Sequence, residues 1–317
     1  LGAFEWRLPS DSHSDNFVAD RACWWIETAP KAEPLFLEIG FPGPHPPYDP
    51  TPDYLSKYLT KKLPIAEVTE KDLEGQPAPF HVLRQHNVEI DHDSVVHQLA
   101  PSDEHRHRQR AHYLANVTMI DDAVGKIVDA LDKKGYLDDC IIVFTSDHGD
   151  CLGDHGHSQK WTMYEQITRV PMILWAPGKV PADQKSEALI QAMDIVPWLL
   201  TQAQAKLPEG MEAVSIEPVF RDSLWPGREA VFCEQGRDNI LTDVQFMTMV
   251  RTKRWKLVHF LNETFGQLFD LENDPMENNN LWTSQNHSTV RQELMDKLLH
   301  WRMESQIKTQ NVFREYR

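Results

Sequence analysis

Residues that could bind a metal ion lie between Phe144 and Asp150. This segment, Phe-Thr-Ser-Asp-His-Gly-Asp, begins as the end of an apolar run and then turns polar. Ligands of open α/β sheets bind beyond the carboxyl ends of the strands. Asp147 and His148 offer an oxygen and a nitrogen to a divalent cation, and Gly149 permits a tight backbone turn beside them. The alternative is that Asp147 caps a turn and that His148 is a surface residue.

Two further side chains could bind an anion or move a proton. Lys160 is followed by Trp161 and Met163, which could draw its ammonium into a partly apolar cleft that holds an anionic oxygen. Its alternative is an ordinary surface lysine. His45 lies in the segment Gly-Pro-His-Pro-Pro-Tyr at 43–48, where the prolines restrict the backbone, and rigid placement suits a proton donor. A proline-rich ligand for an aromatic groove is the alternative.

Other histidines carry weaker signals. His155 and His157 could ligate a metal, although such pairs are common in glycine-rich loops. Seven histidines lie between His81 and His112, and a solvated loop is favoured there over a pH-sensitive or metal-binding face.

The elements that must position these residues follow from hydrophobic periodicity. Apolar residues at three- and four-residue steps predict a helix over 104–134, with Gly135 as its stop. The non-alternating run at 140–144 is typical of a strand buried on both faces of a parallel sheet, and 170–175 resembles the next strand. A strand over 35–39, a helix over 187–203 and a long stretch with little regular structure over 60–103 complete this part.

After about residue 206 the pattern changes. Short strand-like runs over 230–233, 245–251, 255–260 and 267–271 are too close together for parallel crossovers, so they predict antiparallel pairing. An amphipathic helix follows over 290–303. The predicted fold class is therefore α/β. A mostly parallel sheet flanked by helices occupies 1–205, and a small antiparallel subdomain packed on a terminal helix occupies 206–317.

Composition excludes some partners. The chain has 317 residues with 32 Lys and Arg against 48 Asp and Glu, a net charge of −16. This argues against nucleic acid, whose binding depends on basic side chains, but not against a small anion bound beside a metal ion. The apolar runs are too short to span a bilayer, so no membrane partner is expected. Four cysteines without a Cys-x-x-Cys pair predict buried free thiols. The chain begins at Leu1, and we expect an upstream segment to have been removed or left out.

Several segments together resemble the sulfatases of the alkaline phosphatase superfamily. They are the run from Phe144 to Gly156 with Lys160, the Arg-Val-Pro at 169–171, the Gly-Pro-His-Pro-Pro-Tyr at 43–48 and the Leu-Phe-Asp-Leu-Glu-Asn-Asp-Pro at 268–275. The resemblance implies an alkaline-phosphatase-like fold. It implies that Asp147 and His148 ligate a divalent metal, usually Ca²⁺, with Mn²⁺ or Mg²⁺ as alternatives. Lys160 would bind the sulfate group, and His45 would donate a proton to the leaving-group oxygen.

One departure from the family matters. The Cys/Ser-x-Pro-Ser-Arg segment, whose Cys or Ser becomes the formylglycine nucleophile, is absent, and so is an earlier pair of metal-binding aspartates. The chain therefore resembles the carboxy-terminal part of a sulfatase, and 1–205 would be the carboxy-terminal portion of its α/β domain. We expect the missing N-terminal segment of the same protein to complete the sheet and supply formylglycine, and we expect the isolated chain to be inactive.

Three functions stay open at this point. The first is hydrolysis of a small-molecule or carbohydrate sulfate ester by the complete protein. The second is hydrolysis of phosphonate monoesters or phosphodiesters, which relatives in the same superfamily perform. The third, of another class, is a non-catalytic fragment that binds anions through Lys160 and His45. The family resemblance also favours a periplasmic or extracellular location.

Overall fold

The computed structural model describes residues 2–90, 93 and 97–314, and the chain divides into two compact units. The first unit comprises residues 1–68, 84–141 and 150–159. The second comprises residues 69–83, 142–149 and 160–317. All of 206–317 therefore falls in the second unit together with earlier segments. The division at residue 206 between two parts of a longer protein stays a prediction.

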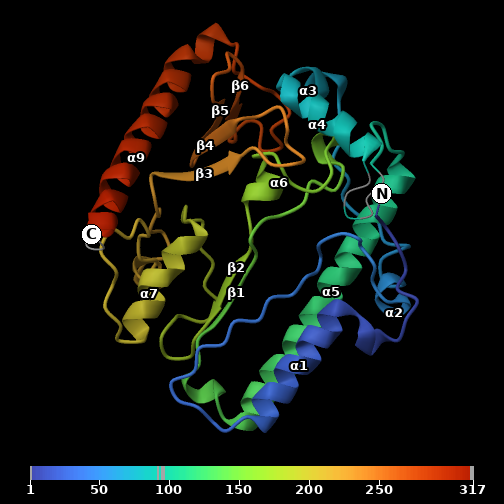
Figure 1. The fold of residues 1–317 in the computed structure, drawn as a ribbon, viewed down its shortest axis with the longest axis vertical. Helices are drawn as coiled ribbons and strands as arrows, with labels where there is room; N and C mark the ends of the chain where they lie inside the picture. The colour runs from blue at the N-terminus through green and yellow to red at the C-terminus, as the bar shows by residue number, and fades with distance from the viewer. Residues whose placement is uncertain (1, 91–92, 94–96, 315–317) are drawn as a thin grey trace. The chain divides into compact units, whose positions relative to one another are not determined.

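Two long helices build the first unit. Helix α1 (Ser14–Thr28) lies along α5 (Asp103–Lys134), and their buried faces meet in a core of small and branched side chains (Figure 1). Helix α5 begins where the Ser102 hydroxyl accepts the His105 N–H, and it ends at Gly135, whose φ of 75° is left-handed. The helix predicted over 104–134 and its glycine stop are thus confirmed. The short α2 (Pro52–Leu55) packs on the same helix.

The stretch over 60–103 is more regular than predicted. It contains α3 (Glu70–Glu74) and α4 (Ala78–Glu89). Phe80 and Leu83 of α4 are buried in the core of the second unit. Helix α4 was not predicted because most of its residues are polar. A narrow apolar stripe is enough to pack a helix against a core.

The first two strands pair differently from the prediction. Strand β1 (Ile142–Thr145) and strand β2 (Met172–Trp175) form an antiparallel ribbon with Phe144 opposite Ile173. A parallel pair needs a crossover, usually a helix, whereas the chain between them holds only short turns such as α6 (Glu165–Thr168). The run over 35–39 is not a strand, since no ladder partner pairs with it among the described residues.

The antiparallel subdomain is confirmed. Its sheet has the order β3-β4-β5-β6, every pair antiparallel, with strands Ala230–Gly236, Phe246–Thr252, Trp255–Phe260 and Gly266–Asp270. Helix α9 (Ser288–Arg314) packs through Leu294 and Leu298 against Leu257 and its neighbours (Figure 1). The opposite face of the sheet covers a second core that includes Tyr164.

The helix predicted over 187–203 is shorter in the structure. Helix α7 spans Ile195–Gln202, with Pro197 in its first turn, and α8 spans Pro218–Arg221. The Asp194 carboxylate precedes α7 and accepts N–H groups from the Arg228 guanidinium and from Gln191 and Val214. Polar bonds of this kind make the helix begin later than its periodicity suggests.

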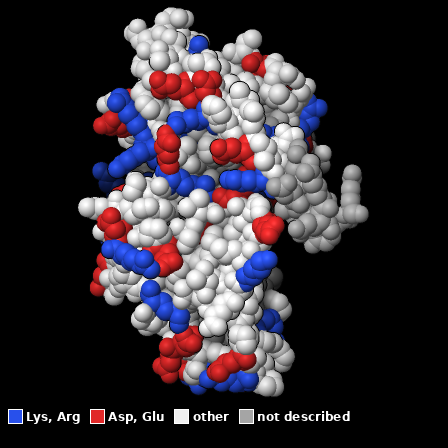
Figure 2. All heavy atoms as spheres, turned by 90° about the vertical axis from the view of Figure 1, so that its left-hand side faces the viewer, with Lys and Arg blue, Asp and Glu red and all other residues white. Residues whose placement is uncertain are grey.

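Three general expectations can be compared with the structure. All four cysteines are free thiols, but only Cys151 is buried and the other three are partly exposed. Among the described helices, none combines the length and the apolar character that a membrane span requires. Acidic and basic side chains are interspersed over the face drawn in Figure 2.

Candidate functional site

Three of the four predicted site residues lie together in the second unit. Asp147 and His148 follow β1 directly, and Lys160 reaches the same place from the next loop. The Lys160 Nζ lies 3.2 Å from His148 Nε2, and that nitrogen lies 3.5 Å from Asp147 Oδ2. We call these residues the Asp147–His148–Lys160 cluster. A carboxylate, an imidazole and an ammonium group therefore converge at the end of a strand.

The tautomer of His148 follows from its hydrogen bond. The ring Nδ1 lies 2.8 Å from the Gly149 carbonyl oxygen, which can only accept, so Nδ1 carries the proton. The Nε2 lone pair can therefore accept a hydrogen bond from the Lys160 ammonium, or it can bind a metal cation. Histidine ligands of metals are commonly oriented by such a bond from the other ring nitrogen.

The Asp147 carboxylate is held in its charged form. Burial raises its pKa, but the hydrogen bonds that Oδ1 accepts from the His148 backbone N–H, at 2.9 Å, and from the Ser146 hydroxyl, at 3.3 Å, help to hold the pKa below its ordinary value. The side chain is 83% exposed, and its second oxygen faces the imidazole. The cluster thus offers an ionised oxygen beside a neutral nitrogen.

The turn that carries the cluster depends on Gly149. Its N–H donates to the Ile167 carbonyl oxygen at 2.9 Å. A Cβ at this position would lie 1.9 Å from the Gln166 carbonyl oxygen, which belongs to the backbone of α6 and has little freedom to move. Only glycine lets the two backbones approach this closely.

Gly149→Ala should therefore destabilise the second unit. We expect the free energy of unfolding to fall by about 1–3 kcal/mol, the usual cost of forcing extra volume into a packed site. Urea denaturation of the 317-residue chain measures it. Gly125→Ala in α5 is the matched control, because a Cβ there meets nothing within 4 Å. If both variants unfolded at the same denaturant concentration, the close approach at Gly149 would have no energetic consequence.

His45 belongs to the first unit. It is exposed on the proline-rich loop that follows residue 41, and its Nδ1 lies 2.9 Å from the Pro46 carbonyl oxygen. A cavity of about 380 Å³ lies beside it, lined in part by Asp15, Asp49 and Asn116. Asp15 and its neighbour His13, which contact this loop, escaped the sequence analysis because no local pattern connects them with residue 45.

His155 and His157 are buried in the first unit and are not part of the cluster. Asp154 beside them forms an ion pair with Arg110. Within the described residues, no group of three or more His, Cys, Asp or Glu side chains is arranged to hold a metal ion. The Asp147–His148–Lys160 cluster supplies two possible metal donors, Asp147 Oδ2 and His148 Nε2.

The histidine-rich stretch is not one solvated surface. His81 and His105 are exposed and His107 is partly exposed, whereas His97 and His112 are buried. Burial lowers the pKa of His97 to about 4, and the positive charge of Arg84 acts in the same direction. His97 is therefore neutral in the folded protein at any pH above this value.

Acid should destabilise the first unit through His97. The folded-state pKa of about 4 lies below the ordinary 6.5, so the unfolded chain takes up the proton first. His97 should leave stability intact above pH 6.5 and lower it as the pH falls towards 4, by about 3 kcal/mol in total. His97→Gln should flatten the pH dependence of the unfolding free energy between pH 7 and 4.5. The exposed His81→Gln is the control. Parallel profiles for wild type and His97→Gln would contradict this assignment.

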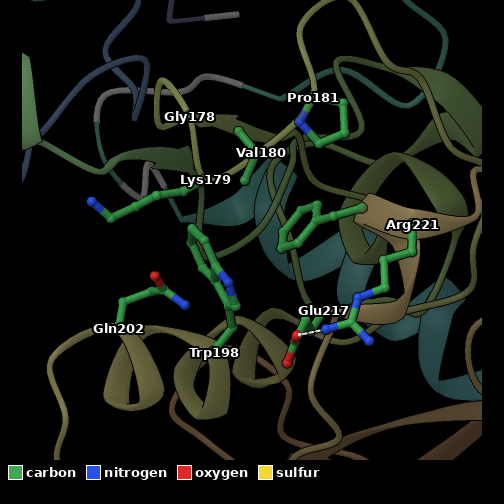
Figure 3. Close-up of a pocket in the computed structure, with 9 residues that line it drawn as sticks. Gly178, Lys179, Val180, Pro181, Trp198, Gln202, Glu217 and Arg221 are labelled. Carbon is green, nitrogen blue, oxygen red and sulfur yellow. Dashed lines mark hydrogen bonds and ion pairs between the residues drawn. The ribbon is translucent and has the colours of Figure 1, made fainter.

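A second cavity, of about 440 Å³, lies in the second unit and contains none of the four predicted residues. It is lined by the segment Gly178–Pro181, by Trp198 and Gln202 of α7, and by Glu217, Phe220 and Arg221. Figure 3 shows Trp198 between Gln202 on one side and the Glu217–Arg221 ion pair on the other, whose closest atoms are 2.6 Å apart. The lining thus carries two basic side chains, Lys179 and Arg221, against the single carboxylate of Glu217.

Comparison with known proteins connects this geometry with a family. A family model described as Sulfatase matches residues 3–205. A second model, described as N-sulphoglucosamine sulphohydrolase, C-terminal, matches residues 153–304. An arylsulfatase of Clostridium perfringens is 28% identical over 293 residues, which is 89% of this chain and 56% of that protein.

Two solved structures are similar in fold. A phosphonate monoester hydrolase of Agrobacterium radiobacter has a TM-score of 0.81 at 25% identity, over 94% of this chain and 62% of that one. The solved structure of a protein in complex with its substrate, D-glucosamine-2-N,6-O-disulfate, has a TM-score of 0.74 at 23% identity. The match covers 93% of this chain and 70% of that one. The predicted alkaline-phosphatase-like α/β fold is thereby confirmed. The chain spans little more than half the length of the arylsulfatase.

Proposed function

This chain belongs to the sulfatase family of hydrolytic enzymes, and on that premise we propose that the longer protein containing it hydrolyses sulfate esters. The observation that carries the proposal is the convergence of Asp147, His148 and Lys160 at the end of β1. An ester sulfate is an anion that gains charge on its bridging oxygen as the S–O bond breaks. A site with cationic and metal-binding groups at that point stabilises the transition state.

Asp147 and His148 are the proposed metal ligands in this chain. The family is generally metal-dependent, and the two donor atoms, Oδ2 and Nε2, lie 3.5 Å apart on one turn, as two ligands of one ion can. A divalent cation bound there would stabilise negative charge on a sulfate oxygen. Ca²⁺ prefers oxygen ligands, whereas imidazole is a good ligand for transition metals. The proposed cation is Ca²⁺, with Mn²⁺ or Mg²⁺ as alternatives, held by the Asp147 carboxylate and the His148 nitrogen.

Lys160 and His45 have the proposed roles towards the ester itself. The Lys160 ammonium lies near the ring of Trp161, with Nζ 5.8 Å from the ring centroid, and would bind a sulfate oxygen as a compact positive charge. His45, on its proline-rich loop, would donate a proton to the oxygen of the departing alcohol as the S–O bond breaks. The attacking oxygen would come from a formylglycine outside this chain.

The partner proposed for this chain is the remaining segment of the same protein. Ribbon β1–β2 exposes large apolar side chains, among them Ile173 at 59% and Trp175 at 40%. Its two strands pair only with each other among the described residues. Exposed apolar strands of this kind support the proposal that further strands of a longer chain pair with the ribbon and cover it. A periplasmic or extracellular location remains part of the proposal.

A phosphonate or phosphodiester substrate is the second candidate function. The fold similarity to a phosphonate monoester hydrolase favours it. A paired assay of the longer protein with an aryl sulfate and the matching aryl phosphonate monoester separates the two. We expect the higher kcat/KM with the sulfate, and a higher value with the phosphonate would reverse the order.

The isolated chain should bind anions without turning them over. Calorimetric titration of the 317 residues with inorganic sulfate tests this, and Lys160→Ala serves as the comparison. If the isolated chain hydrolysed a sulfate ester at enzymatic rates, the nucleophile would have to be among its own residues. The chemical class of alcohol in the ester is open, and the similarity to a glucosamine disulfate complex makes amino-sugar sulfates the first compounds to assay.

A further inference from the structure

We propose that Asp15, assisted by His13, is a positioning residue that holds the His45 loop in its working conformation. The inference rests on the proposed function, because it assigns Asp15 an effect on proton donation by His45. All the residues concerned belong to the first unit. Neither Asp15 nor His13 is adjacent in sequence to the loop it holds.

The loop around His45 has few hydrogen-bond donors of its own. Five of the nine residues from Pro42 to Pro50 are prolines, which leaves backbone N–H groups only at Gly43, His45, Tyr48 and Asp49. The Gly43 N–H donates to Asp15 Oδ1 at 2.8 Å, and the Tyr48 N–H donates to the Gly2 carbonyl oxygen at 2.7 Å. The backbone just before His45 is therefore anchored by a side chain of α1.

The contact at Gly43 is close as well as polar. A Cβ on Gly43 would lie 2.2 Å from Asp15 Oδ2, so the loop backbone lies directly on the carboxylate. Asp15 is 1% exposed. Burial raises its pKa, while the Gly43 N–H and His13 act in the opposite direction. A buried carboxylate is retained at such a cost where its hydrogen bonds hold a specific backbone geometry.

His13 holds the other end of the loop. Its Nδ1 accepts the Asp15 N–H at 3.2 Å as the N-cap of α1, so the ring proton is on Nε2. Nε2 then donates to Asp49 Oδ1 at 3.3 Å. The Tyr48 hydroxyl, between the two ends, donates to Asp150 Oδ2 at 2.6 Å. The first residues of α1 thus hold the loop both before and after His45.

Loss of this anchor should affect one step of the reaction. A general acid works only when its nitrogen is within hydrogen-bond distance of the leaving oxygen, and a displacement of about 1 Å can lower the rate about 100-fold. Proton donation matters most when the departing alcohol is a poor leaving group. An activated aryl sulfate departs without much help. Asp15→Ala should therefore distinguish the two kinds of ester.

The experiment compares Asp15→Ala with Asp15→Asn in the longer protein. For an unactivated alkyl or sugar sulfate, we expect Asp15→Ala to lower kcat about 100-fold with KM little changed. For 4-nitrophenyl sulfate the loss should be no more than a few-fold. Asp15→Asn keeps a carbonyl oxygen that can accept the Gly43 N–H, so it should restore most of the activity. Asp20→Ala on the same helix is the control.

A second measurement does not depend on catalysis. Hydrogen exchange of the 317-residue chain should show faster exchange at Gly43 and His45 in Asp15→Ala, and near-wild-type exchange in Asp15→Asn. It also shows whether the variant is folded elsewhere. If Asp15→Ala does not fold, Asp15→Asn combined with His13→Gln is compared in its place, and it should lose the alkyl sulfate activity selectively.

Different failures have different meanings. Equal losses with both esters, or unchanged exchange at Gly43, would overturn the positioning role while leaving sulfate hydrolysis intact. A wild-type protein that hydrolyses neither ester, yet shows the exchange difference, would reject the proposed function and keep the structural anchor.

Discussion

Lys160→Ala in the longer protein should lower kcat/KM for a sulfate ester by about 100- to 1,000-fold, the usual cost of removing one group that stabilises developing negative charge. The Lys160 ammonium lies 3.2 Å from the imidazole of the proposed metal ligand His148, so it is the cation at the place where the sulfate is proposed to bind. Steady-state kinetics with an aryl sulfate measures the effect.

Two comparisons make this result specific. Lys160→Arg keeps the charge but replaces a compact ammonium with a planar guanidinium, and should recover only part of the activity. Lys185→Ala removes an exposed lysine of the same unit and should leave kcat/KM unchanged. If Lys160→Ala kept full activity, Lys160 would have no role in binding the sulfate group.

Lys256→Met should destabilise the second unit by about 3–5 kcal/mol, the range for breaking a buried ion pair from one side. Lys256 is 0% exposed, and its Nζ lies 2.8 Å from Glu165 and 2.7 Å from Glu277. It also donates to the Met163 carbonyl oxygen at 2.9 Å. Without the ammonium, two carboxylates would face each other in the core.

The pKa values of Glu165 and Glu277 agree with a stabilising role of the Lys256 ammonium. Burial raises the pKa of Glu277. Burial also acts to raise the pKa of Glu165, but the charges of Lys256 and Arg251 hold it below the ordinary value. Because both acids lose their common partner, the double variant Lys256→Met with Glu277→Gln should recover part of the stability.

Chemical denaturation of the 317-residue chain tests this prediction. Lys253→Met is the matched control, because Lys253 is exposed at the turn that precedes the same strand. If Lys256→Met were no less stable than Lys253→Met, the buried charge cluster would not contribute to folding. If the folded fraction of Lys256→Met still binds anions, then the ion pairs of Lys256 with Glu165 and Glu277 serve the fold and not anion binding.

Local patterns were sufficient where one segment determines its own structure. Helix α5 was predicted because its apolar stripe, serine N-cap and terminal glycine all lie within the helix itself. The meander β3–β6 was predicted because short connections allow only antiparallel neighbours. The neighbouring positions of Asp147 and His148 likewise predicted that both side chains lie on one turn after a strand, whereas metal binding by them stays a proposal.

Contacts between distant segments were not predictable in the same way. The pairing of β1 with β2 depends on the path of the intervening chain, and the run over 35–39 failed to become a strand for want of a partner. Lys256 and Glu277 form one cluster with Glu165 although they are far apart in sequence. A strand or a buried charge is stable only with a partner, and periodicity does not identify that partner.

The sequence by itself determined the chemistry available to this protein: a carboxylate and an imidazole on one turn, a lysine soon after, and a histidine among prolines. The tertiary structure decided which of these groups meet, bringing Lys160 to His148 and anchoring the His45 loop on Asp15. Side-chain type is a property of each residue. A distance of about 3 Å between residues of different segments arises only when those segments have packed together.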